Sequence, residues 1–107
     1  MEPAASPDLP LACDPAAIPA AERPAHLALA RHLFTEAAQE RRDLPDGLAF
    51  RLPAEAWEPA ALFVANERRC CPFLRFELSA APAAGPVRLR ITGPAGTRDF
   101  LRAELRL

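Results

Sequence analysis

Three segments of the chain place apolar residues at steps of three and four, the spacing that brings side chains to one face of a helix. The first segment is residues 20–42. The second, residues 53–69, is broadly apolar, and Trp57 is expected in the core. The third is a short stripe over residues 97–105, where Thr97 is expected to act as the N-cap. The apolar stripe of the first predicted helix consists of Leu27, Ala30, Leu33, Phe34 and Ala37.

Three other segments alternate apolar and polar side chains, which is typical of half-buried strands. They are residues 48–52, 74–79 and 87–91. The sequence Leu-Pro-Asp-Gly at 44–47 is a turn signal that should end the first helix, and Gly85 favours a hairpin between the last two strands. We therefore expect an α+β fold in the order α-β-α-β-β-α, with a small three-stranded antiparallel sheet and helices packed on one face.

The length of 107 residues is enough for one ordinary domain. Residues 1–19 are rich in proline and alanine and are interpreted as an N-terminal arm, disordered up to Leu11, that precedes a single domain over residues 20–107. The first twenty residues contain no basic residue and several prolines, unlike a signal peptide. No apolar run approaches the roughly 20 residues of a membrane span. A cytoplasmic protein is expected.

Charge and composition exclude several classes of function. The 13 basic residues, all arginine, face 14 acidic residues, so the chain lacks the basic excess that nucleic acid or an anionic membrane requires. Without lysine, Schiff-base chemistry and a phosphate-loop lysine are excluded, and no serine–histidine–acid set is visible. A binding role is favoured over an enzymatic one. Four arginines are expected on the outer sheet face as a solvated surface: Arg51, Arg75, Arg88 and Arg90.

The chemistry of the chain is expected in its three cysteines, which a cytoplasmic protein should hold as thiols. Cys70 and Cys71 come directly before Pro72, where a helix must end, so the adjacent thiols can converge on one ion. Glu67 lies one turn earlier on the same helix face and can supply a third ligand. If Cys13 folds back, a site with three sulfurs results. Such soft ligands select Zn(II), Cu(I) or Hg(II), or a metalloid such as As(III).

Two other interpretations of the cysteines remain open. Free cysteine is among the most buried residue types, so Cys70 and Cys71 can be packing residues in a structural or protein-interaction module. Alternatively, a vicinal pair can serve thiol redox chemistry. His26 and His32 are expected on the surface of the first helix, and His32 is the better candidate for an additional ligand.

The chain resembles a family of small, largely uncharacterised bacterial proteins. The resemblance rests on E-R-x-C-C-P-F at 67–73, F-x-L at 76–78 and L-x-I-T-G-P at 89–94, together with Cys13 and Arg23. Members occur alone, and similar segments form C-terminal extensions of regulators that resemble the mercury-responsive type. The resemblance implies sensing or sequestration of a thiophilic metal in a heavy-metal response. The positions that match the polar signature of the family are Cys13, Arg23, Glu67, Arg68, Cys70 and Cys71.

The hypothesis from the sequence is therefore a small protein that binds a thiophilic metal or metalloid ion. Cys70, Cys71, Cys13 and Glu67 are the predicted ligands. Arg23 and Arg68 are predicted to support them, by pairing with Glu67 or with carbonyl groups at a helix end. No direct contact with nucleic acid or membrane is expected.

Overall fold

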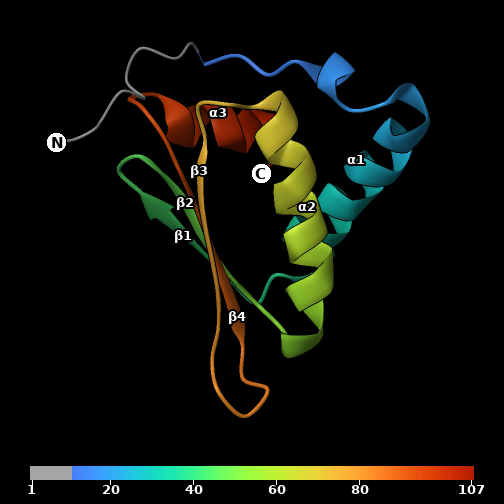
Figure 1. Ribbon diagram of the computed structural model, residues 1–107. Helices are drawn as coiled ribbons and strands as arrows, with labels where there is room; N and C mark the ends of the chain where they lie inside the picture. The colour runs from blue at the N-terminus through green and yellow to red at the C-terminus, as the bar shows by residue number, and fades with distance from the viewer. Residues whose placement is uncertain (1–10) are drawn as a thin grey trace, which may run out of the picture.

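The computed structural model describes residues 11–107, and within them three α-helices lie against one face of a four-stranded sheet (Figure 1). The expected disorder at the start of the arm falls on residues 1–10, outside the described residues. No helix in the described range is long and apolar enough to cross a membrane. The main elements are α1 (Arg23–Arg31), β1 (Glu40–Leu44), β2 (Gly47–Leu52), α2 (Trp57–Cys70), β3 (Arg75–Ala80), β4 (Val87–Thr92) and α3 (Thr97–Glu104).

The sheet has the order β1-β2-β4-β3, and every neighbouring pair is antiparallel. The predicted α+β class and the hairpin between β3 and β4 are confirmed. The predicted number of three strands is wrong, because β1 adds a fourth strand at the edge beside β2. The helices cover the face that carries the apolar side chains, and the opposite face stays uncovered (Figure 1).

Strand β1 replaces what the sequence predicts as the end of the first helix. Its sequence is Glu-Arg-Arg-Asp-Leu, and its first four residues are exposed, so no alternation of apolar and polar positions marks it as a strand. It exists because the tight turn at 45–46 folds it back on β2, whose backbone groups would otherwise lack partners. The turn signal at residues 44–47 is therefore real, but it joins two strands.

The first helix is also shorter and more irregular than its pattern predicts. After α1 the chain continues as a π-helical turn, η4 (His32–Ala37), where the hydroxyl group of Thr35 donates to the carbonyl of Arg31 at 2.6 Å. The wider turn changes which side chains face the sheet. Leu33 and Phe34 are buried, whereas Leu27, expected in the same apolar stripe, is 66% exposed.

The core forms between the apolar faces of the strands and the helices. The ring of Phe34 packs against Phe50 of β2 and Phe63 of α2, at centroid distances of 4.5 and 4.9 Å. Trp57 was expected in this core and is instead 42% exposed, because the buried stripe of α2 runs beside it. The alternation predicted for β2 and β4 is confirmed by the fully or nearly fully buried side chains of Leu48, Phe50, Leu52, Val87, Leu89 and Ile91.

Helix α3 closes one end of the fold. Its N-cap is Gly96, whose φ of +94° is one that residues with a side chain rarely adopt. The predicted N-cap, Thr97, is the first helical residue; its buried hydroxyl group donates to the carbonyl of Pro94 at 2.7 Å. Leu101 packs into the core, while Arg102 lies 3.5 Å from Asp43 of β1. These two contacts join α3 to the core and to β1.

Candidate thiol and carboxylate site

The segment before α1 crosses the C-terminal end of α2 and is fastened there by hydrogen bonds. The backbone N–H of Asp14 donates to the carbonyl of Cys70 at 2.7 Å, which satisfies an acceptor that the end of a helix leaves free. Ile18 is buried at 2% exposure. The guanidinium Nε of Arg23 donates to the carbonyls of Pro15 and Ile18, at 3.0 and 2.9 Å. Arg23 thus joins α1 to the arm through two backbone carbonyl groups.

This docking brings all three cysteines together. The sulfurs of Cys13 and Cys71 are at disulfide-bonding distance, with their Cα atoms 4.4 Å apart. The Sγ atoms of Cys70 and Cys71 are 3.7 Å apart, and Cys70 remains a free thiol. The expectation that all three cysteines are thiols is therefore wrong for this form of the protein. The pairing joins residues 58 positions apart, and only the docked arm makes it possible.

Glu67 is the centre of the site. Its side chain is buried on α2, and its Oε1 lies 2.9 Å from Nε2 of His26. The sulfurs of Cys70 and Cys71 lie 3.7 and 3.5 Å from its carboxylate oxygens. One ligand atom from each of Cys13, Glu67, Cys70 and Cys71 falls within 4.8 Å of all the others. The structure thus brings the four predicted ligands to one place.

The surface position predicted for both histidines is confirmed for His32 and is wrong for His26. His26, expected on the surface, is 8% exposed; its ring stacks on Phe63 at a centroid distance of 5.4 Å and contacts Glu67. No partner within residues 11–107 reaches its Nδ1 atom. His32, the better candidate from the sequence, is exposed and pairs with Glu36. His26 is recruited by a residue 41 positions away, and no local pattern indicates that contact.

Glu104 of α3 is a further site residue that the sequence did not indicate. Its Oε2 lies 3.8 Å from the sulfur of Cys71. Burial of the carboxyl group, the charge of Glu67 and a hydrogen bond with Glu67 raise the pKa of Glu104 to about 8. This raised pKa favours the protonated form of Glu104 at neutral pH, although the residue as a whole remains exposed.

The Cys70 thiol is held in its neutral form. Burial, and then the charges of Glu67 and Glu104, raise its pKa to about 12. A cation placed among these groups would reverse this effect, because it favours the thiolate and the carboxylate together. In the free site Cys70 is therefore a predicted ligand that still carries its proton.

Arg68, the second predicted supporting residue, does not join the site. It is exposed on α2, and within the described part of the chain no hydrogen bond or ion pair involves it. The carboxyl groups that influence the pKa of the Cys70 thiol are those of Glu67 and Glu104 instead.

A cavity of about 150 Å³ opens beside the sulfurs. Cys13, Cys70 and Glu67 form part of its wall, and Leu27, an exposed side chain, stands at its rim. Cys71, with no exposed surface, lies behind that wall. Two of the three sulfurs are thus within reach of a small molecule that enters the cavity.

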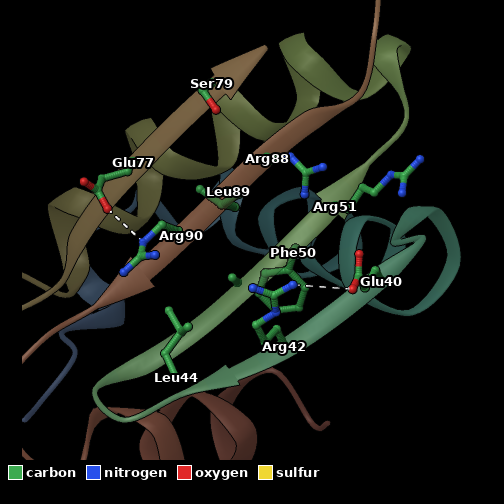
Figure 2. Close-up of a pocket in the computed structure, with 11 residues that line it drawn as sticks. Glu40, Arg42, Leu44, Phe50, Arg51, Glu77, Ser79, Arg88, Leu89 and Arg90 are labelled. Carbon is green, nitrogen blue, oxygen red and sulfur yellow. Dashed lines mark ion pairs between the residues drawn. The ribbon is translucent and has the colours of Figure 1, made fainter. Parts of the chain in front are cut away.

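A second concave surface lies on the uncovered face of the sheet (Figure 2). It is a shallow groove of about 520 Å³. Arg51 and Arg88 face each other across β2 and β4, and Arg90 pairs with Glu77 at 3.1 Å. The outward placement predicted for these arginines is confirmed, and Arg42 of β1 extends the row.

Comparison of this chain with models of known families, with curated proteins and with solved structures found no match. What the site can do therefore follows from its own side chains.

Proposed function

We propose that the reduced protein binds a thiophilic metal or metalloid ion at this site, for sensing or sequestration. Cys70 and Cys71 are the principal ligands, and Cys13 and Glu67 complete the set. The observation that carries the proposal is the approach of four donor atoms, three of them sulfur, to within 4.8 Å of one another. The proposed compartment is the cytoplasm, where the thiol pool keeps such cysteines reduced.

The spacing of the two principal sulfurs suits one bound ion. Two thiolates about 2.3 Å from a tetrahedral zinc ion lie about 3.8 Å from each other. The Sγ atoms of Cys70 and Cys71 are 3.7 Å apart before any ion is added. Little movement of these two side chains is needed, and Cys13 approaches from the docked arm on the same side.

The buried carboxylate distinguishes this arrangement from simple packing. Cysteines that only fill a core need hydrocarbon neighbours, whereas Cys70 and Cys71 both contact Glu67. A buried carboxylate beside two thiols is unfavourable without a compensating partner. His26 supplies one hydrogen bond to it, and a bound cation would balance the remaining charge.

The Cys13–Cys71 pair also supports a second candidate function, thiol–disulfide exchange. Two external thiols reduce this disulfide to two cysteine thiols and are themselves joined as a disulfide. Cys70 is a poor internal nucleophile for such exchange, because its pKa of about 12 leaves few thiolates at neutral pH. While the disulfide is intact, Cys13 and Cys71 cannot bind an ion, so the proposed metal site forms only after the protein is reduced.

The test is an anaerobic titration of the reduced protein with Zn(II), Cu(I) and Hg(II), after removal of the reductant. We expect one ion per chain for the wild type. The Cys70→Ser/Cys71→Ser double variant should bind at least about a hundredfold more weakly, since loss of mere outer contacts already weakens metal sites 10–100-fold. Glu77→Gln, which changes an exposed carboxylate of β3, is the matched control and should bind like the wild type.

Equal uptake by the double variant and the wild type would contradict the proposal. Iodoacetamide labelling separates the redox alternative. Rapid labelling of Cys70 at neutral pH in the folded protein would favour exchange chemistry, whereas slow labelling agrees with a thiol held in its protonated form.

A further inference from the structure

The cavity beside the thiols is larger than an ion needs and has two chemically different ends. At one end are the sulfurs of Cys13 and Cys70 and the carboxyl groups of Glu67 and Glu104. The other end is hydrocarbon. Its apolar lining consists of Leu27, Ala30 and Phe63, whereas Ile18 packs in one cluster with Cys70 and Cys71 at the sulfur end. Arg23 and His26 also line the cavity.

The size of the cavity indicates what the apolar end can hold. A bound ion lies about 2.3 Å from its thiolates and so occupies only the sulfur end. The whole cavity measures about 150 Å³. An apolar cavity of about that volume in another protein admits a benzene ring. The cavity is therefore large enough to hold one small organic group beside the sulfurs.

We infer that the ligand of this site is a trivalent arsenical with one apolar carbon substituent, of aryl or short alkyl type. This inference rests on the proposed function and names its ligand class. For this ligand the sulfur pair is Cys13 and Cys70, in place of the Cys70 and Cys71 pair proposed for a bare ion, and the substituent lies against Phe63 and Ala30. Cys13 and Cys70 line the cavity, whereas Cys71 has no exposed surface and is not part of the lining. An arsenic atom that keeps one carbon substituent has two bonds left for sulfur, which matches the two exposed thiols.

The binding step balances without an oxidant. An organoarsenic oxide, R–As=O, reacts with the two thiols to give R–As(S–Cys)₂ and one water molecule. Two arsenic–sulfur bonds form, the arsenic–oxygen bond breaks, and both thiol protons leave in the water while arsenic stays trivalent. The Cys13–Cys71 disulfide must be opened first, by a phosphine and one water molecule: the sulfur–sulfur bond breaks, the oxygen of the water forms the phosphine oxide, and its two hydrogens go to the two thiols.

The experiment compares three probes on the reduced protein: phenylarsine oxide, arsenite and Zn(II). We expect phenylarsine oxide to bind at least about tenfold more tightly than arsenite, because its ring leaves water for the apolar end. Ala30→Leu fills that end from α1 and should lower the affinity for phenylarsine oxide at least about tenfold, while Zn(II) affinity stays within about twofold. Ala28→Leu places the same side chain at an exposed position of α1 and is the matched control.

Leu27→Ser provides a second variant that keeps the fold, since Leu27 is exposed at the rim. It should also weaken phenylarsine oxide binding more than Zn(II) binding. The inference is overturned if phenylarsine oxide shows no advantage over arsenite, or if Ala30→Leu and Ala28→Leu behave alike. Failure of the reduced wild type to bind either Zn(II) or arsenite would instead overturn the proposed function. Zn(II) binding without any effect of the ring would overturn the inference alone.

Discussion

At the scale of single residues, the site is organised by a buried carboxylate. Glu67 contacts the imidazole of His26 and the sulfurs of Cys70 and Cys71, and its charge reaches Glu104. The charge of Glu67 raises the pKa of Cys70 and of Glu104, and its contact with Nε2 orients the ring of His26. The thiols are therefore placed in a polar, charged setting although they are almost completely enclosed.

The raised pKa of Glu104 predicts a pH dependence of stability. Its carboxyl group titrates near the ordinary value of 4.5 in the unfolded chain and at about 8 in the folded protein. A raised carboxyl pKa contributes stability below the unfolded value and loses it as pH rises through the folded value. The metal-free, disulfide-bonded protein should therefore show a falling melting temperature between pH 5 and pH 8.5, approximately the interval between those two values.

Glu104→Gln isolates this effect, because it keeps a similar shape and cannot ionise. Its melting temperature should change less with pH over the same range than that of the wild type. Glu36→Gln, at an exposed position of η4, is the control and should follow the wild type. Identical pH slopes for Glu104→Gln and the wild type would show that Glu104 does not titrate in this way.

At the scale of elements, the site depends on one short segment that is not part of the sheet or of the long helices. The arm carries Cys13 and is held by the buried side chain of Ile18 and by the hydrogen bonds from Arg23. It packs on the end of α2 in a small apolar cluster of its own, separate from the main core. Loss of this cluster should open the site and leave the rest of the fold in place.

Ile18→Ala tests the attachment of the arm in the reduced, metal-free protein. Truncation of a buried isoleucine costs about 2–5 kcal/mol, and here that loss should fall on the docking of the arm. We expect alkylation of Cys13 to become at least about tenfold faster, with a small change in global melting temperature. Leu62→Ala, at an exposed position of α2, should leave the alkylation rate unchanged. Equal rates in Ile18→Ala and the wild type would mean that the arm is held elsewhere.

The sequence pattern predicted the strands that have one buried and one exposed face. It missed the strand that has no buried face. The strands β2 and β4 follow their alternation because one of their faces is buried. Strand β1 has no buried face, and its existence depends on pairing with β2, which only the folded chain reveals. The same limit applies to η4, whose wider turn no sequence pattern indicates, and to Leu27 of α1, which is exposed although it was expected in the apolar stripe.

At the scale of the whole molecule, the Cys13–Cys71 link closes a loop across most of the described chain. A cross-link over 58 residues restricts the unfolded chain by about 4 kcal/mol in the loop-entropy account, and native disulfides usually contribute about 2–4 kcal/mol. The free energy of unfolding of the oxidised protein should thus exceed that of the reduced protein by about 2–4 kcal/mol. Urea unfolding with and without a phosphine reductant measures the difference.

Two cysteine variants make this measurement specific. Cys70→Ala retains the disulfide and should keep the dependence on reductant, whereas Cys13→Ser should unfold at the same urea concentration with or without it. Coincident unfolding curves for the oxidised and reduced wild type would contradict the prediction. A bound ion should restore part of the stability lost on reduction, because it joins the same residues.

The local part of the site was predictable and the non-local part was not. Glu67, Cys70 and Cys71 share one helix turn and its end, so their spacing alone indicates that they meet. Cys13 required an assumption that the arm folds back. His26 and Glu104 lie 41 and 33 positions from their partners, and residues of their type are ordinary on helix surfaces. Distance along the chain, more than chemical type, decided which residues were found.

The scattering of these residues along the chain also determines when the protein first becomes competent. A ribosome releases Cys13 first, then Cys70, and Glu104 only after most of the polypeptide has emerged. Before folding, Cys13 is therefore separated from the adjacent pair Cys70 and Cys71, and only the folded chain brings all three sulfurs to one place. Under the proposed function, the folded protein holds a thiophilic ion with more donor atoms than the chain does while it is still being made.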